Sequence, residues 1–174
     1  MQKKICLLGT FAVGKTSLTD RFVKSIFSDR YRTTVGVRIQ KKTVSLDGQV
    51  LDLIIWDLAG EDEFVVLRTA YLRGAAGYIL VADGTRPASL DKAIDLHKRA
   101  RSALGDVPFI LLVNKTDRST DWAIEERALA ELDREGWPVV LTSAKTGQGV
   151  EDAFTRLAKA VLYGEKRDLA ARDR

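Results

Sequence analysis

Continuous apolar runs alternate with stretches of helical periodicity over most of the chain. Residues 5–8, 78–82, 109–113 and 139–141 are almost wholly apolar, which is typical of strands that are buried on both faces. The stretch after residue 149 instead shows the spacing of a helix with one buried stripe, formed by Val150, Phe154, Leu157, Ala158 and Val161. This alternation predicts a parallel sheet that is covered by helices on both faces.

One segment departs from this pattern and predicts a hairpin. Apolar and polar residues alternate within residues 37–46, and the turn signal Asp47-Gly48 precedes a returning strand at residues 50–56. We therefore expect an α/β fold with a six-stranded mixed sheet, one antiparallel edge strand and five flanking helices. One of the five helices is counted at residues 62–73, a polar stretch that fits either a short helix or a mobile loop.

The composition fits a single soluble domain. With 174 residues, of which 45% are hydrophobic, the chain is long enough for one sizeable core and too short for two ordinary domains. We assign residues 1–164 to this domain and residues 165–174 to a charged tail that frays. The 28 lysines and arginines are scattered among 24 acidic residues, which indicates a solvated surface, so we expect no nucleic-acid partner.

The sequence predicts no direct attachment to a membrane. No apolar run approaches the ~20 residues that a bilayer span needs, and the first residues do not form a signal sequence. Gln2 excludes myristoylation of a second-position glycine, and the tail as printed has no cysteine to prenylate, although a longer natural tail stays open. Cys6 lies in the first apolar strand, where it packs as a small hydrophobe and fits a reducing compartment. We expect a cytoplasmic monomer.

The loop after the first strand carries the most specific motif. Gly9-Thr10-Phe11-Ala12-Val13-Gly14-Lys15-Thr16-Ser17 matches G-x-x-x-x-G-K-[ST] between a strand and a helical pattern. Its glycines let successive N–H groups converge on phosphate oxygens beside the positive end of the next helix, a fit that an ordinary turn does not explain. We expect Lys15 to bridge the β- and γ-phosphates and Thr16 to bind Mg²⁺. The residues expected to bind the nucleotide here are Gly9, Ala12, Val13, Gly14, Lys15, Thr16 and Ser17.

Asp57 and Gly60 follow the second strand of the predicted hairpin. In sheets of this kind ligands bind beyond the carboxyl ends of the strands. Asp57 suits a water-mediated bond to Mg²⁺, and Gly60 has no side chain to keep its N–H away from a γ-phosphate. Asp-x-x-Gly alone is a common turn, but a preceding phosphate loop favours the functional interpretation.

Two later strand ends predict which base is bound. Asn114-Lys115-Thr116-Asp117 follows residues 109–113, and the Asp117 carboxylate can accept both N1–H and the exocyclic amine of guanine, a pattern that adenine lacks. The competing interpretation is a polar loop whose aspartate caps the next helix. Ser143-Ala144-Lys145 offers backbone N–H groups to the guanine O6, and it is weak evidence alone. The predicted base-binding residues are Asn114, Lys115, Asp117, Ser143, Ala144 and Lys145.

With these four elements in order, the chain resembles the Ras superfamily of small GTPases, a P-loop NTPase fold, over essentially its whole length. It is most similar to the Rab branch, through Trp56-Asp57-Leu58-Ala59-Gly60, Arg68-Thr69, Tyr71-Leu72-Arg73-Gly74-Ala75 and residues 77–83. The resemblance implies a molecular switch that binds GTP with Mg²⁺ and hydrolyses it to GDP and phosphate. It also implies that residues 29–37 (switch I) and 59–74 (switch II) change shape between the two states.

The same resemblance implies roles for individual switch residues. Phe27 is expected to pack against guanine, Tyr31 to cover the phosphates, and Thr34 to coordinate Mg²⁺ only when GTP is bound. Effector, exchange and activating proteins are expected to bind the switches, effectors through the cluster Ile39, Trp56 and Tyr71. Ile39 replaces the usual phenylalanine, and these three side chains can equally well just fill the space between the sheet and switch II.

Two residues depart from the family pattern near the expected site of GTP hydrolysis. Glu61 stands where the resemblance puts a glutamine that orients the attacking water, and its negative charge beside the phosphates makes slow turnover as plausible as catalysis. Phe11 occupies a loop position that relatives often fill with glycine or a small residue, where we expect its ring to obstruct an arginine supplied by an activating protein. Arg30 or Arg32 in switch I can supply such a charge from within the chain, or face solvent or a partner.

Competing functions follow from these departures. The leading hypothesis is a GTP-hydrolysing switch whose output is protein binding. Glu61 and Phe11 together suggest an alternative, a module that stays GTP-bound and binds proteins with little turnover. A GTPase module excised from a larger protein also stays open, whereas a nucleotide kinase is disfavoured by the guanine-selecting Asp117.

Overall fold

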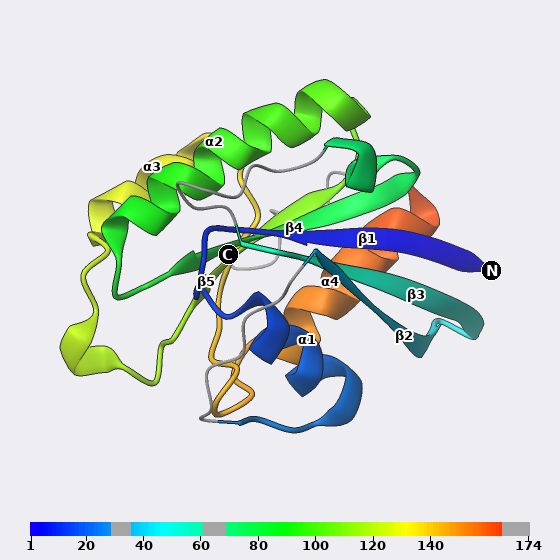
Figure 1. Cartoon of the computed structure of the whole chain (residues 1–174), viewed down its shortest axis with the longest axis horizontal. Helices are drawn as coiled ribbons and strands as arrows, with labels where there is room; N and C mark the ends of the chain where they lie inside the picture. Colours follow the sequence, from blue (N-terminus) through cyan, green and yellow to red (C-terminus); the bar gives the residue numbers. More distant parts are fainter. Residues whose placement is uncertain (29–35, 61–68, 165–174) are drawn as a thin grey trace.

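The computed structural model describes residues 1–28, 36–60 and 69–164. Its strands form one six-stranded sheet in the order β2-β3-β1-β4-β5-β6. Only β2 runs antiparallel to its neighbour, and the other pairs are parallel (Figure 1). The strands are β1 (Gln2–Leu8), β2 (Val37–Leu46), β3 (Gln49–Leu58), β4 (Ala75–Asp83), β5 (Phe109–Asn114) and β6 (Val139–Leu141). The predicted mixed sheet with an antiparallel edge strand is confirmed.

Helices cover both faces of this sheet. α2 and α3 lie on one face, and α1 and α4 lie on the other (Figure 1). The helices are α1 (Lys15–Lys24), α2 (Pro87–Leu104), α3 (Glu126–Arg134) and α4 (Val150–Tyr163), with 3₁₀ turns η1 (Thr69–Leu72) and η2 (Ser119–Asp121). The described residues thus contain four α-helices, whereas we expected five. The difference lies in the stretch 62–73, of which residues 62–68 lie outside the described residues and the remainder forms the single turn η1.

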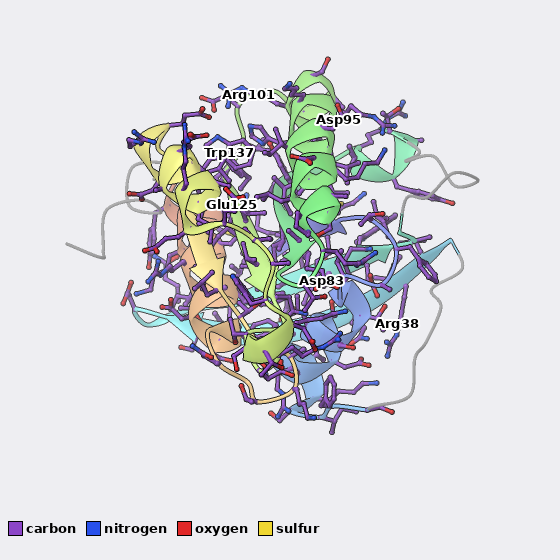
Figure 2. The ribbon with its side chains drawn as sticks, turned by 90° about the vertical axis from the view of Figure 1, so that its left-hand side faces the viewer. Arg38, Asp83, Asp95, Arg101, Glu125 and Trp137 are labelled. Carbon is purple, nitrogen blue, oxygen red and sulfur yellow. The ribbon has the colours of Figure 1, made fainter. Side chains whose placement is uncertain are left out.

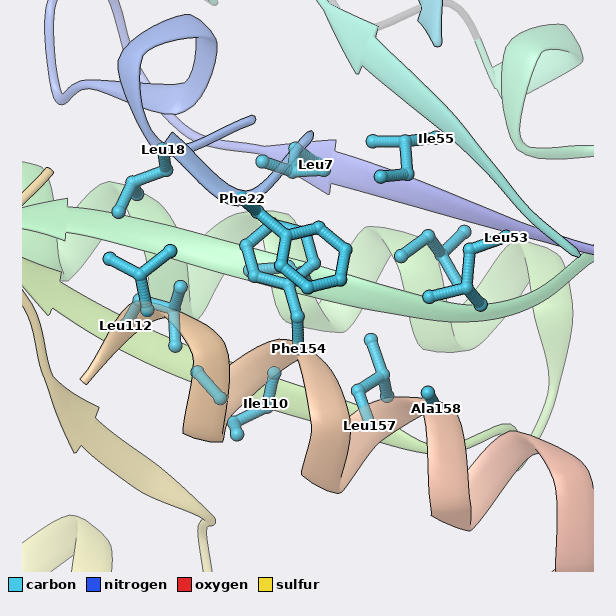
Figure 3. Close-up of a cluster of buried hydrophobic side chains, with 14 of the residues drawn as sticks. Leu7, Leu18, Phe22, Leu53, Ile55, Ile110, Leu112, Phe154, Leu157 and Ala158 are labelled. Atoms are coloured by element: carbon cyan, nitrogen blue, oxygen red, sulfur yellow. The ribbon is translucent and has the colours of Figure 1, made fainter. Parts of the chain in front are cut away.

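The core between the sheet and α1 and α4 is centred on two stacked rings. Phe22 of α1 and Phe154 of α4 lie with their ring centroids 4.2 Å apart and their planes 11° from parallel (Figure 3). Leu7, Leu53 and Ile55 from the sheet surround them and are fully buried. The predicted stripe on the last helix is therefore confirmed, because its apolar residues pack into this core.

The core on the opposite face contains the single histidine. His97 of α2 lies 4.2 Å from Phe109 and 4.4 Å from Trp137, measured between ring centroids, and the Tyr78 hydroxyl lies 3.0 Å from its Nδ1. Burial lowers the pKa of His97, and the charge of Arg101 lowers it further. His97 therefore acts as a packed core residue, far from the motifs at the strand ends.

The hairpin of β2 and β3 turns at Asp47 and Gly48, whose φ angles of 49° and 83° are both left-handed. Such a pair makes a two-residue turn whose twist matches that of the strands. Along β2, Val44 and Leu46 face the core shared with α1 and α4, whereas Ile39 pairs with Trp56 on the opposite face and is 52% exposed.

The parallel strands bring their carboxyl ends to one edge of the sheet. The loops that follow β1, β3, β4, β5 and β6 all begin at this edge (Figure 1). The four nucleotide-binding motifs singled out in the sequence lie at the ends of β1, β3, β5 and β6, so the fold gathers motifs that lie more than a hundred residues apart. Among the described helices, none has the length and the apolar character that crossing a bilayer demands.

Candidate functional site

The loop between β1 and α1 has the curled backbone that a phosphate-binding loop needs. Gly14 has a φ of 106°, and a Cβ at this position would lie 2.3 Å from Nδ2 of Asn114. A side chain at Gly14 is therefore excluded both by its backbone and by its neighbour. Ala12 also has a left-handed φ, 63°, although it is not a glycine, so its surroundings must hold it there.

Lys15 is buried at the centre of this loop. Its Nζ donates to the carbonyl oxygens of Gly9 at 3.0 Å and Thr10 at 3.2 Å. Burial lowers the pKa of Lys15 from 10.5 to about 8. The negative charge of Asp57 opposes this shift, and the positive charge of Arg86 adds to it. A phosphate group beside this ammonium would offset the cost of its burial, which fits the predicted role of Lys15.

Thr16 and Asp57 lie together, although 41 residues separate them in the chain. The Thr16 hydroxyl donates to Oδ2 of Asp57 at 2.5 Å, and Asp57 is fully buried. Burial raises the pKa of this carboxyl, while the hydrogen bond from Thr16 and the charge of Lys15 counteract the rise. A hydroxyl and a buried carboxylate beside a lysine are the donor set that fits Mg²⁺ shared with phosphates. Thr34, the third predicted ligand, lies outside the described residues.

Gly60 lies directly against the phosphate loop. A Cβ on Gly60 would lie 2.6 Å from Cα of Phe11 and 2.8 Å from its nitrogen, so any side chain here would displace one of the two segments. The neighbouring Ala59 N–H donates to the Gly36 carbonyl at 2.8 Å. The end of β3 thus contacts both the phosphate loop and the residue before β2.

Asn114 joins three loops by its side chain. Its Nδ2 donates to the Val13 carbonyl at 3.0 Å, while its Oδ1 accepts from the Thr142 hydroxyl and from the Ala144 N–H, each at 3.2 Å. Asn114 is buried at the end of β5. The phosphate loop and both predicted base-binding loops are therefore fixed relative to one another by one amide group.

Lys115 contacts the phosphate loop and an acidic residue that the sequence analysis did not single out. Its Nζ donates to the Ala12 carbonyl at 2.9 Å and forms an ion pair with Oδ2 of Asp83 at 2.8 Å. Asp83 ends β4 (Figure 2). Its side chain is 1% exposed. Ligands bind beyond the carboxyl ends of parallel strands, and Asp83 lies at the carboxyl end of β4. Its position could therefore have been predicted from the sequence.

Gly84, the next residue, shows how tightly this corner is packed. A Cβ on Gly84 would lie 2.0 Å from the ring of Trp122, which follows η2. The Gly84 carbonyl accepts from the Ala123 N–H at 2.8 Å. The segment after β5 therefore packs against the end of β4, next to Asp83.

The two predicted base-binding loops also contact each other directly. The exposed Asp117 accepts a hydrogen bond at Oδ1 from the Ser143 hydroxyl at 2.7 Å, and the same hydroxyl accepts from the Thr146 N–H at 3.0 Å. Arg21 of α1, which the sequence analysis did not single out, donates to the carbonyls of Ala144, at 2.8 Å, and Lys145. No local pattern marks Arg21, because its partners lie more than a hundred residues away.

The remaining predicted site residues fall into two groups, those that the structure describes and those that lie outside the described residues. Ser17 lies in the first turn of α1, Phe27 is half-buried against the core shared with α1 and α4, and the Lys145 side chain lies at an exposed position. The expectations for Arg30, Tyr31, Arg32, Thr34 and Glu61 fall outside the described residues.

The three residues predicted to contact effectors lie side by side. Ile39 pairs with Trp56 across β2 and β3, and the Trp56 and Tyr71 rings lie 6.4 Å apart. Lys4 holds this cluster in place, because its Nζ lies 3.5 Å from the Trp56 ring centroid and donates to the Tyr71 and Arg73 carbonyls at 2.6 and 2.8 Å.

Comparison with known proteins agrees with this arrangement. The chain matches the Ras family model over residues 4–163. It is 36% identical over 161 residues to Ras-related protein Rab-13 of Canis lupus familiaris, covering 91% of this chain and 79% of the relative. It is 38% identical over 162 residues to GTP-binding protein yptV2 of Volvox carteri, covering 91% and 75%. With Ras-related protein SEC4 of Saccharomyces cerevisiae it shares 36% identity over 159 residues, covering 91% and 74%. The chain belongs to the Ras family of small GTPases and is similar to its Rab-related members.

Proposed function

We propose that this chain binds guanine nucleotides with Mg²⁺ and hydrolyses GTP to GDP and phosphate, and that its switch loops bind effector proteins in the GTP state. The observation that carries the proposal is the position of Asn114, whose amide joins the phosphate loop to both predicted base-binding loops. The three loops thus form one preformed surface, which a nucleotide can contact with both its phosphates and its base.

The phosphate end of this surface is the reacting end. The buried Lys15 would supply a positive charge to the β- and γ-phosphates, and Gly60, which lies against the phosphate loop, would bring its N–H toward the γ-phosphate. Thr16, Asp57 and Thr34 would hold Mg²⁺, which when bound supplies further positive charge to the same phosphates. Glu61 follows Gly60 and would orient the attacking water or accept its proton.

The base end selects guanine. The Asp117 carboxylate lies at an exposed position where a base can reach it, and the Ser143 hydroxyl occupies only its Oδ1. Accepting N1–H and the exocyclic amine of guanine satisfies this carboxylate, whereas adenine presents an acceptor at N1. Phe27 and the backbone of Ala144 and Lys145 complete the base site.

Partner proteins are proposed to bind the switches and the cluster of Ile39, Trp56 and Tyr71. Ile39 is 52% exposed on the edge strand β2, where a partner can reach it. The nearby Lys4 fixes Tyr71 and Arg73 by their carbonyls, so the partner meets a defined surface. Arg30 or Arg32 would act at the phosphates only if their substitution by alanine slows hydrolysis.

A second candidate is a module that stays GTP-bound, and Phe11 favours it. Phe11 is 39% exposed on the phosphate loop, where its ring would obstruct a catalytic group brought by an activating protein. Both candidate functions involve the same guanine nucleotides, and they differ in the rate of GTP hydrolysis.

Identifying the nucleotide that co-purifies with the chain, then measuring single-turnover phosphate release from bound GTP, tests the proposal. We expect guanine nucleotides to co-purify and GTP to be converted to GDP. Excess GTP and GDP should displace the bound nucleotide, whereas excess ATP should not. Lys15→Glu should abolish uptake. GTP that remains intact over hours would leave only the GTP-bound module, and preferential binding of ATP would refute both candidates.

A further inference from the structure

Three consecutive carbonyl groups of the phosphate loop are each held by a side chain from elsewhere in the fold. The Val13 carbonyl accepts from Asn114 at 3.0 Å and the Ala12 carbonyl from Lys115 at 2.9 Å. The Phe11 carbonyl accepts from Arg86, whose Nη2 lies 2.6 Å away. Arg86 immediately precedes α2 and belongs to none of the motifs found in the sequence.

These bonds fix the direction of the N–H groups in the loop. All peptide bonds of the described residues are trans, and in a trans peptide the C=O and the N–H point in opposite directions. A Phe11 carbonyl that points to Arg86 therefore turns the Ala12 N–H to the opposite side. Lys115 and Asn114 turn the N–H groups of Val13 and Gly14 in the same way, so three donors are aimed together into the curl of the loop.

Ala12 is the residue that most needs this support. Its φ of 63° is left-handed, which an alanine adopts only when its surroundings impose it. The peptide before its Cα is held by Arg86 and the peptide after it by Lys115. Arg86 thus controls φ of Ala12 from one side while Lys115 controls ψ from the other.

Asp83 joins the two cations. Its Oδ2 lies 3.1 Å from Nε of Arg86 and 2.8 Å from Nζ of Lys115, and its Oδ1 accepts from Thr85. Although its side chain is nearly fully buried, the hydrogen bonds from Lys115 and Thr85 outweigh the effect of burial and hold the pKa of Asp83 below its usual value. Arg86 is half-exposed, yet this buried carboxylate holds it in one orientation.

We propose that Arg86 is a positioning residue for nucleotide binding, which rests on the proposed function. Anchored by Asp83, it holds the peptide between Phe11 and Ala12 so that the Ala12 N–H faces the phosphates of a guanine nucleotide. In this role Arg86 acts on the phosphates through the backbone of the loop. Its effect is to keep the loop in the binding conformation, and so to lengthen the residence time of GDP and GTP alike.

Release of a fluorescently labelled GDP tests this role in the presence of Mg²⁺. Arg86→Ala is expected to accelerate release about tenfold, the scale of one charge-assisted hydrogen bond. Arg86→Lys keeps the charge and one donor, so its release rate should lie closer to that of the unmodified chain. Arg101→Ala is the matched control, because Arg101 lies at the opposite end of α2 (Figure 2). There it pairs with Asp106 at 3.4 Å. Its release rate should not change.

Phosphorus NMR of bound GDP separates this role from a merely structural one. Arg86→Ala should shift the phosphate resonances, and Arg101→Ala should not. An Arg86→Ala chain that releases GDP within twofold of the unmodified rate would overturn the inference while leaving the proposed function intact. Faster release with unshifted resonances would also overturn it, since that outcome describes general loosening. An unmodified chain that retains no guanine nucleotide would overturn the proposed function, and the inference with it.

Discussion

The Thr16 hydroxyl donates to the Asp57 carboxylate at 2.5 Å, and this bond joins the start of α1 to the end of β3. Both groups have oxygen atoms of the kind that coordinate Mg²⁺. The pair therefore predicts how strongly nucleotide retention depends on the metal.

Asp57→Asn should raise the Mg²⁺ concentration needed for half-maximal GDP retention by tenfold or more, because an amide oxygen carries no full negative charge. Labelled-GDP release measured over a series of Mg²⁺ concentrations checks this. Thr16→Ser keeps the hydroxyl and serves as the control. An Asp57→Asn chain with an unchanged Mg²⁺ dependence would show that Asp57 does not act through the metal.

Replacing Glu61 by glutamine should speed hydrolysis. A carboxylate beside the γ-phosphate repels the charge that this group already carries, and glutamine removes that repulsion while still orienting water. We expect single-turnover phosphate release to rise about tenfold, which corresponds to about 1.4 kcal/mol of barrier. Glu135→Gln, at an exposed position after α3, is the control. A slower Glu61→Gln chain would instead identify Glu61 as a general base.

Asp117→Asn should change which base is bound. The amide places N–H donors or a single acceptor where guanine presents two donors, so GDP affinity should fall by about a hundredfold or more. Xanthosine diphosphate, whose base has an oxygen in place of the amine, should regain affinity. Calorimetry with both nucleotides measures this, and Asp121→Asn, which only breaks an exposed pair with Arg118, is the control. Unchanged GDP affinity would contradict the assignment of Asp117.

Removing one of the two stacked rings in the core should destabilise the fold. Phe154→Ala is expected to lower the free energy of unfolding by about 3–5 kcal/mol, because it leaves a cavity against Phe22. Urea unfolding with GDP at one fixed concentration measures the change, since bound nucleotide also stabilises the folded state. Val50→Ala, at a position 62% exposed, should cost far less. Equal losses for the two variants would contradict the packing described for Phe154.

The buried His97 predicts a fall of stability in mild acid. Burial lowers its pKa in the folded state, so the unfolded chain binds more protons as the pH falls below about 6.5. The free energy of unfolding should therefore decrease between about pH 7.5 and 5.5. His97→Gln, which keeps a polar partner for Tyr78, should flatten that part of the curve. Parallel curves for the two chains would show that His97 does not contribute.

The fold was largely predictable because burial leaves a pattern in the sequence. Strand β5 begins where its apolar run begins, since both of its faces are covered. Strand β6 also matches its apolar run, but the expectation that residues 139–141 are buried on both faces is wrong, because β6 lies at the edge of the sheet and Leu141 is 44% exposed. The start of β4 was missed by three residues, because the small side chains of Ala75, Ala76 and Gly77 lack the apolar signal of residues 78–82.

The site could be predicted only where the residues that form it lie close together in the sequence. The phosphate loop, Asp117 and Ser143 carry their spacing within short motifs, and the structure gathers them at one edge of the sheet. Arg86 and Arg21 act on backbone carbonyls 75 and 123 residues away. Periodicity and spacing contain no information about such contacts, which exist only after the sheet has formed.

The indole that covers Gly84 has a practical use. Tryptophan emission is sensitive to the polarity around the ring, and Trp122 lies beside the corner of the sheet that Asp83 occupies. Replacing the other two tryptophans, Trp56 and Trp137, by phenylalanine would leave Trp122 as the only tryptophan. The protein would then report events at this corner through its own fluorescence, with no label attached.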